Sequence, residues 1–308
     1  MNLSRRAVLF GTFAWCASRK TAEAGGHHVA FTFFQGHGAG ESSRGMRLGL
    51  VEAERVAQLL GATIEVMDPA ARTRAAVWIG MSHDLPMTPS RIPSIVVDDG
   101  DSEGGAPRFR VMASLARRLV RIGSWLKATH ADRWTVCAST PGQRAAAISA
   151  LRRIPGVELV HQPNRAHAVL VLDREAASAA RPDPDAWIVA GSGEAAAFES
   201  HRCVWAEEWH PSLKRYGALE LNERYRRAYD EPMSPAAWAG WFGVKCAAEA
   251  AFRGSPAHLA QSLRSARVDG HKGVALRFLP DGTLEQPLYL VGRSTRAGEM
   301  ELLDQGEP

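Results

Sequence analysis

The sequence predicts an α/β protein of two Rossmann-like lobes, each with a parallel sheet, joined by a hinge. Short β-prone runs alternate with amphipathic helices along most of the 308 residues, and the alternation begins a second time near residue 134. The composition, 45% hydrophobic and 23% charged, provides apolar mass for two modest cores. Short apolar strands between helices are typical of parallel sheets covered on both faces.

Residues 1–24 resemble an export signal. A basic head (residues 1–6) precedes a short apolar run (residues 7–18), and Ala22-Glu23-Ala24 fits the small-x-small rule of signal peptidase. Ser4-Arg5-Arg6 also resembles a twin-arginine signal. The alternative is a basic, slightly apolar start of a cytosolic protein. We expect cleavage after Ala24 and export to the periplasm.

The charge expected after cleavage gives no electrostatic case for nucleic acid. The leader carries four of the basic residues and one acid, so its removal lowers the net charge from +4 to +1. Phosphate binding needs a concentrated basic face. Cys137, Cys203 and Cys246 would remain, an odd number that leaves at least one thiol unpaired. Their apolar surroundings favour three buried free cysteines.

The elements of the first lobe follow in order after the leader. An amphipathic helix is expected over residues 44–60, with Ser42 or Ser43 as its cap and Gly61 at its end. A second long helix is expected on the stripe from Val111 to Leu126. The expected strands are residues 29–34, 63–66, 75–79 and 94–97.

The second series starts with a strand at residues 134–138. Helices are expected near residues 143–153 and 211–229, and another from Ser234, a cap followed by Pro235. Residues 273–278 and 288–291, around a Pro-Asp-Gly turn, predict a β-hairpin. The other expected strands are residues 157–160, 168–172, 187–190 and 203–205.

Three stretches resemble the type I periplasmic binding proteins of the branched-chain amino acid ABC transporter class. Ser43-Arg44-Gly45-Met46 is similar to the start of the family's first helix, and Val77-Trp78-Ile79-Gly80 to its short third strand. Val268-Asp269-Gly270 through Pro280-Asp281-Gly282 is similar to its late glycine-rich segment. The stretches before Ile95 and Phe109 are short for the family, so one covering helix of the first lobe is expected to be reduced to a turn.

A narrower resemblance lies in the second half. The succession Glu208-Trp209-His210-Pro211, Asn222-Glu223-Arg224-Tyr225 and Trp238-Ala239-Gly240-Trp241 is similar to solute-binding proteins found with pyrroloquinoline quinone (PQQ)-dependent alcohol dehydrogenase systems. It implies PQQ, or a related planar aromatic carboxylate, as the ligand, and an ABC permease as partner. The PQQ-dependent dehydrogenase system is a further expected partner. A non-transport sensor of the same fold, for an alcohol, amine or amide, is the alternative.

The resemblance implies lobes made of separate segments. The first lobe is expected from residues 25–118 plus about 230–268. The second is expected from residues 119–229 plus about 269–308. Binding would close the lobes by a hinge, and the closed form would dock on the permease.

Ligands of parallel α/β sheets lie beyond the carboxyl ends of the strands, where loop amides and helix N-termini converge. This rule selects residues on both lobes. Those of the first lobe are Gln35, His37, Gly80, Ser82, Asp98 and Asp99. Those of the second lobe are Ser139, Thr140, Asp173, Arg174, Ser192, Glu207, Trp209 and His210.

Aromatic residues at this edge fit more than one role. PQQ would need a stacking ring and several donors, for which Trp209 and His210 are the candidates. Alternatively, Trp209 packs at the start of the next helix and His210 caps it. Trp238 and Trp241 lie at helical spacing, which favours the core, and Lys245 on that face snorkels or meets a carboxylate.

One metal site is conceivable at the processed terminus. Gly25-Gly26-His27 would offer an amine, two amides and an imidazole, a square-planar nitrogen set suited to Cu(II) or Ni(II), with His27 as the side-chain ligand. The alternative is an accidental tail.

The sequence lacks the motifs of common enzyme classes. Gly191-Ser192-Gly193 lacks the spacing of a nucleophile elbow, and there is no Gly-Lys-Ser/Thr phosphate loop. The acidic pairs Asp98-Asp99 and Glu207-Glu208 fit solvated loops or weak cation sites. We therefore expect a binding protein without enzymatic activity or a required cofactor.

Overall fold

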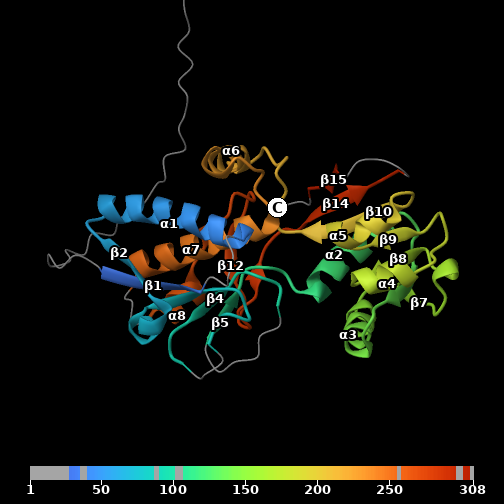
Figure 1. Cartoon of the computed structure of the whole chain (residues 1–308), viewed down its shortest axis with the longest axis horizontal. Coiled ribbons are helices and arrows are strands. Elements are labelled where there is room, and N and C mark those ends of the chain that lie inside the picture. Colours follow the sequence, from blue (N-terminus) through green and yellow to red (C-terminus); the bar gives the residue numbers. More distant parts are fainter. Residues whose placement is uncertain are drawn as a thin grey trace, which may run out of the picture.

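A computed structural model places two α/β lobes side by side along the long axis of the molecule (Figure 1). The structure describes residues 28–34, 40–86, 90–100, 107–254, 258–295 and 301–305. The expected export signal lies outside these residues. Each lobe contains a sheet with parallel strands, which confirms the predicted fold class.

The first sheet has five parallel strands in the order β2-β1-β3-β4-β5. Its central strands are apolar and buried on both faces, as parallel strands between helices must be. The bounds are β1 His28–Phe34, β2 Thr63–Met67, β3 Val77–Gly80, β4 Ser94–Val96 and β5 Arg108–Arg110. β5 was not predicted, because a three-residue strand flanked by arginines carries little periodic signal.

Two long helices, α1 (Glu41–Leu59) and α7 (Pro235–Arg253), cover one face of this sheet (Figure 1). α7 starts as predicted, because the Ser234 hydroxyl accepts a hydrogen bond from the Ala237 N–H and Pro235 takes the first helical position. α1 starts three residues before the predicted position. Its N-cap is Gly40, and Ser42 and Ser43 are buried inside its first turn rather than capping it. A short helix, α8 (Leu259–Ser265), packs beside α7.

The second sheet has seven strands in the order β15-β14-β10-β9-β8-β6-β7. β7, β6, β8, β9 and β10 are parallel, and β14 and β15 add antiparallel strands beyond β10. The bounds are β6 Arg133–Cys137, β7 Glu158–Leu159, β8 Ala168–Val171, β9 Trp187–Val189, β10 Arg202–Glu207, β14 Tyr289–Arg293 and β15 Glu301–Asp304. Its helices are α2 Leu115–Lys127, α3 Pro141–Leu151, α4 Arg174–Ala179 and α5 Ser192–Ala195.

A small antiparallel sheet, β11-β12-β13, lies beside the first lobe. Its strands are β11 Val268–Asp269, β12 Ala275–Phe278 and β13 Leu284–Glu285. The predicted hairpin is therefore wrong in its second strand. Residues 275–278 pair with Leu284 and Glu285, whereas residues 289–293 leave the turn and join β10 in the second sheet.

The predicted helix over residues 211–229 begins only at Ala218, as α6 (Ala218–Tyr229). Tyr216 and Gly217 both have positive φ, +58° and +82°, which no α-helix includes, so the chain turns there before the helix starts. The stretch between β3 and β4 forms turns and no helix in its described residues, as the short spacing predicted. None of the helices built from described residues is long and apolar enough to cross a bilayer.

Within the described residues, the chain crosses between the lobes at three places. Val111 packs in the core of the first lobe and Ala113 in that of the second, so the first crossing lies between them. The second lies between Ala206 and Trp209, and the third near Leu288, just before β14. Consequently residues 209–229 and β12 pack with the first lobe, whereas the sequence-based boundaries group them with the second. Likewise Leu115 packs with the second lobe, before the expected boundary at residue 118.

Candidate functional site

The polar residues selected from the sequence follow strands of both sheets. Ser82 follows β3 and Asp98 follows β4, whereas the second sheet supplies residues after β6, β8, β9 and β10. These strand ends point from each lobe toward the middle of the molecule, where the chain crosses (Figure 1). Gln35, His37 and the metal candidate His27 lie outside the described residues. The structure thus places the rest at the two facing edges, and their contact with a ligand stays a prediction.

Ser82 and Asp98 form one unit at the edge of the first lobe. The Ser82 backbone N–H donates to Asp98 Oδ1 at 2.9 Å, and its hydroxyl donates to Oδ2 at 2.7 Å. His83 lies 4.0 Å from the same carboxylate, and Asp99 is exposed beside it. The Asp98 carboxylate therefore orders the loop after β3 and holds Ser82 at the edge, whereas the exposed imidazole of His83 lies closer to Asp84, at 3.5 Å.

Ser139 and Asp173 form the matching unit of the second lobe. Asp173 Oδ2 accepts the Ser139 N–H at 2.8 Å, and Oδ1 caps α4 by accepting the Ala176 N–H, also at 2.8 Å. These hydrogen bonds, from Ala176 first and then Ser139, lower the pKa of Asp173. The carboxylate thereby fixes the loop after β6 relative to α4.

Three helix starts and one cation lie at that same edge. Thr140 caps the eleven-residue α3 by accepting the Gln143 N–H, and Arg174 is exposed in the first turn of α4. Ser192 is the first residue of α5. Helix N-terminal amides, a hydroxyl and a guanidinium are donors suited to a carboxylate. This edge of the second lobe is therefore able to hold an organic acid.

Glu207 is the last residue of β10 and lies at the second crossing. Burial, followed by the negative charge of Glu208, raises its pKa to about 7, although Arg118 opposes the shift. Glu207 therefore changes charge in the neutral pH range, next to the facing strand ends.

Glu208 is fully buried, so the solvated-loop and weak-cation interpretations of Glu207-Glu208 are wrong for this residue. Its Oε1 accepts the Ala113 N–H at 2.8 Å and lies 2.9 Å from the Arg118 guanidinium. Arg118 also donates to the carbonyls of Ala113 and Ala206. A buried charge survives only with such partners, and here the partners belong to two of the three crossings.

Lys272 and Gln286 extend this buried group to the third crossing. Lys272 Nζ donates to Gln286 Oε1 at 2.7 Å and to the Pro287 carbonyl at 3.2 Å, and Gln286 donates to the Val111 carbonyl at 2.6 Å. Burial lowers the pKa of Lys272, and the charge of Glu208 opposes this shift. Sequence reasoning did not bring these four residues together, because the side-chain contacts between them join positions 90 and 14 residues apart.

Trp209 does not present its ring to the edge. It is fully buried, and its Nε1 donates to Asn222 Oδ1 at 2.8 Å. Its ring stacks on that of Trp238, with 5.9 Å between the ring centroids and 9° between the ring planes. The proposed stacking role is therefore wrong for this conformation. Trp209 packs against α6, as in the packing alternative, but the N-cap of that helix is Gly217, so the expected capping by His210 is wrong. Trp238 and Trp241 are buried in the same core, as predicted.

His210 is half-buried and fixed by the following turn. Its Nδ1 lies 2.7 Å from the Ser212 hydroxyl and accepts the Ser212 N–H at 3.3 Å, which leaves the proton on Nε2. Burial lowers its pKa, so the ring is neutral at neutral pH. Its Nε2–H remains a candidate donor.

In the described part of the chain, the cysteines and the possible metal-binding clusters are as follows. Cys203 and Cys246 are buried, as predicted, whereas Cys137 is half-buried, and the described cysteines form no disulfide with one another. No group of three or more His, Cys, Asp or Glu side chains in this part could hold a metal ion.

Comparison of the structure with solved proteins gives matches over most of the chain. An ABC transporter substrate-binding protein from Desulfitobacterium hafniense, in complex with Leu, has a TM-score of 0.68 at 14% identity, covering 90% of this chain and 99% of its own. The branched-chain amino acid transporter substrate-binding protein LivJ from Streptococcus pneumoniae, in complex with isoleucine, has a TM-score of 0.62 at 13% identity, covering 91% and 100%. A solute-binding protein from R. palustris, in complex with benzoate, has a TM-score of 0.57 at 13% identity, covering 91% and 96%.

The sequence itself matches no family model and no curated protein. At sequence identities of 13–14%, these matches establish a shared fold and no more. The agreement nevertheless extends over both lobes and nearly the whole length of each neighbour. The chain therefore has the type I periplasmic binding protein fold, the fold of these ABC transporter substrate-binding proteins.

Proposed function

We propose that the chain is the substrate-binding component of an ABC importer, exported to the periplasm, and that its two lobes close on a small organic carboxylate. The observation that carries this proposal is the arrangement of the two sheets: polar side chains follow the strands of both, at edges that face each other across three chain crossings. Such an edge is where α/β sheets bind ligands. Closure by rotation about the crossings would then enclose the ligand.

The donors at the edge of the second lobe favour a carboxylate. The capped start of α3, the Ser139 hydroxyl and Arg174 offer N–H and O–H groups together with one positive charge. On the first lobe, Asp98 offers an acceptor and His83 a donor. Binding needs no more than these groups, so the proposal is a transport protein that releases its ligand unchanged to a membrane permease.

Within this class we propose a planar aromatic acid, with PQQ as the largest candidate. The support is the PQQ-related resemblance of residues 208–241 and the benzoate bound by the R. palustris neighbour. Trp209 no longer contributes to this proposal, because its ring is buried. The link to a PQQ-dependent dehydrogenase system depends on the same resemblance and stays a prediction.

Calorimetric titration of the processed protein with benzoate, PQQ, leucine and isoleucine tests both levels of the proposal. We expect one equivalent of benzoate or PQQ to bind, and affinity to fall in Arg174→Gln. Arg152→Gln is the matched control, since Arg152 is exposed at the opposite end of α3. Binding of leucine or isoleucine alone would replace the aromatic class with amino acids, and saturation by none of the four would contradict the carboxylate proposal.

A further inference from the structure

α1 and α7 lie side by side and run in the same direction, and they touch most closely at their first turns. A Cβ on Gly45 would lie 1.8 Å from the Ala237 carbonyl oxygen, and one on Gly240 would lie 2.1 Å from the Ser42 oxygen. Farther along, Gly49 still faces Trp241 and Val244. The glycines thus let the two backbones meet at the end of the lobe that faces the crossings.

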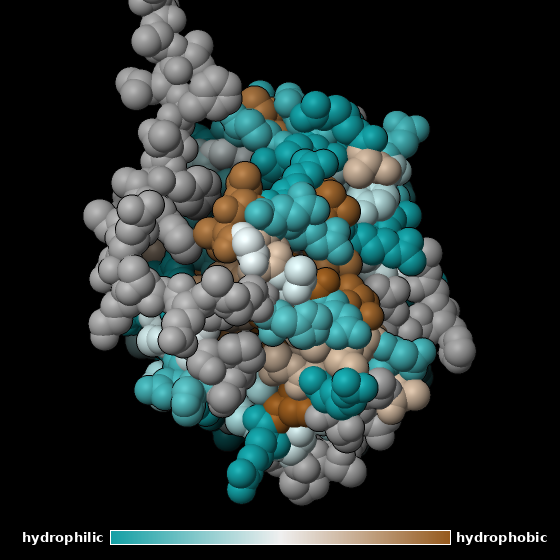
Figure 2. Space-filling model, turned by 90° about the vertical axis from the view of Figure 1, so that its left-hand side faces the viewer, coloured by the Kyte–Doolittle hydropathy of each residue, from teal (hydrophilic) through white to brown (hydrophobic). Residues whose placement is uncertain are grey.

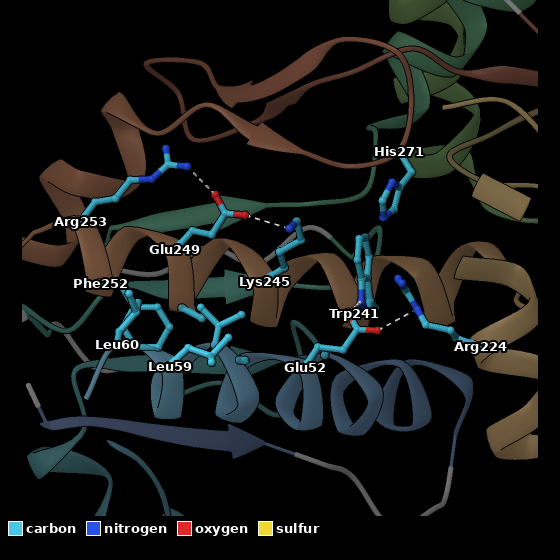
Figure 3. Close-up of a pocket in the computed structure, with 14 residues that line it drawn as sticks. Glu52, Leu59, Leu60, Arg224, Trp241, Lys245, Glu249, Phe252, Arg253 and His271 are labelled. Atoms are coloured by element: carbon cyan, nitrogen blue, oxygen red, sulfur yellow. Dashed lines mark hydrogen bonds and ion pairs between the residues drawn. The ribbon is translucent and has the colours of Figure 1, made fainter. Parts of the chain in front are cut away.

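Toward their last turns the same two helices enclose a cavity of about 410 Å³ (Figure 3). This volume is in the range of small-molecule sites. Its apolar wall is formed by side chains of both helices: Ala53, Val56, Leu59, Leu60, Trp241, Ala248 and Phe252. Leu59 is 87% exposed and Val56 is 46% exposed, so apolar surface continues onto the outside of the lobe. Figure 2 views this end of the molecule and shows apolar side chains gathered among polar ones.

The charged side chains of the cavity lie in two groups (Figure 3). Glu52 accepts the Trp241 N–H at 2.9 Å and pairs with Arg224 at 3.0 Å. Glu249 pairs with both Lys245 and Arg253, each at 2.8 Å. His271 stacks on Trp241, and burial lowers its pKa, so it is neutral at neutral pH. Three cations therefore face two carboxylates.

We propose that this cavity, named here the α1–α7 groove, is a second ligand site that binds an organic monoanion with an apolar body, such as a medium-chain carboxylate. The apolar body would lie along Ala53, Val56 and Ala248 between the helices, and its carboxylate would meet Lys245. Lys245 is able to accept a second anion because Glu249 keeps Arg253 as a partner. The excess of one positive charge selects an anion over a neutral or cationic molecule of the same shape.

This site is separate from the strand ends of the proposed transport site. Its lining runs from Gly49 on α1 and Trp241 on α7 to Leu60 and Arg253 at the far ends of the two helices. None of the strand-end residues proposed for the transport site lines the groove, so the two sites share no residue.

Calorimetric titration with octanoate, 1-octanol and octylammonium tests the role of charge, because the three molecules share one apolar chain and are negative, neutral and positive. Octanoate is expected to saturate one site and to bind most tightly, also in the presence of saturating benzoate. Val56→Trp fills the groove from an exposed position and should abolish saturation. Val51→Trp is the matched control, because Val51 is 44% exposed on the same helix but does not line the cavity. Lys245→Gln should weaken octanoate about tenfold and leave 1-octanol unchanged.

Three results would overturn the proposal: no saturable octanoate binding, binding that survives Val56→Trp, or an equal preference for the three molecules. The other possible occupant of the groove is a second copy of this chain. Sedimentation of the unliganded protein tests for such a dimer. A dimer that Val56→Trp dissociates and Val51→Trp does not would make the groove an interface between two copies instead. None of these results bears on benzoate binding, which Arg174→Gln reports independently.

Discussion

The Arg118 guanidinium lies 2.9 Å from Glu208 Oε1, in an ion pair from which solvent is excluded. Through their other hydrogen bonds these two residues hold the backbone of Ala113 and Ala206, one on each of two lobe crossings. Gln286 attaches the third crossing to Val111 of the first, and Lys272 donates to Gln286 and Pro287 of the third. The segments about which the lobes would move are thus joined by charged and polar groups rather than by apolar packing alone.

Glu208→Gln tests how much this pair stabilises the fold. The amide still accepts the Ala113 N–H, but it leaves Arg118 buried without an opposite charge. We expect the free energy of unfolding in urea to fall by about 3–5 kcal/mol. Glu285→Gln is the control, since Glu285 pairs with Arg277 at the surface, and should cost less than about 1 kcal/mol. Equal losses of unfolding free energy in the two variants would show that the buried pair stabilises the fold no more than a surface pair does.

Glu207 predicts a pH dependence of stability. Its pKa is about 7 in the folded protein and has the ordinary value of 4.5 in the unfolded chain. Between these values the folded state holds a proton that the unfolded state has lost, so this contribution falls as pH rises from about 4.5 to 7. Relative to Glu207→Gln, the wild type should lose roughly 2–3 kcal/mol over this window, measured by urea unfolding at several pH values. A constant difference between the two proteins would contradict the raised pKa.

Trp209→Ala should act on stability and not on ligand recognition. The buried indole packs on Trp238 and donates to Asn222, so its removal should lower the free energy of unfolding by about 3–5 kcal/mol. Val120→Ala, at a half-exposed position of α2, should change it by less than about 0.5 kcal/mol. A variant that keeps its stability but loses carboxylate binding would restore the stacking role.

The difference between Trp209 and Trp238 shows how far the sequence determines such assignments. Trp238 lies in a periodic helix, so its burial follows from spacing, and the start of α7 follows from Ser234 and Pro235. Trp209 lies after a strand, where the same residue type suits a ligand edge or a core equally. Its partners Asn222 and Trp238, thirteen and twenty-nine residues away, distinguish the two.

Contacts between residues far apart in the sequence explain the other differences between the predicted and the observed structure. The apolar run at residues 288–291 was correctly predicted as a strand, but its partner is β10, some eighty residues earlier, and no turn rule encodes that choice. Glu208 has the local context of a solvated acid, and its burial depends on Arg118, ninety residues away. By contrast, the positions of Ser82, Ser139 and Arg174 after parallel strands follow directly from the alternation of strands and helices.

Gly45→Ala tests the close contact between α1 and α7. The added Cβ would lie 1.8 Å from a backbone oxygen of α7, which no side-chain movement relieves, so the two helices must separate. We expect a loss of about 1–3 kcal/mol or more in the free energy of unfolding. In Gly142→Ala, where a Cβ in α3 meets nothing within 4 Å, the better helix propensity of alanine should leave stability unchanged or raise it by up to about 1 kcal/mol. Because separated helices would also widen the groove between them, Gly45→Ala should alter octanoate binding while Gly142→Ala leaves it intact, and a fully stable Gly45→Ala protein would refute the close approach on which the shape of the groove depends.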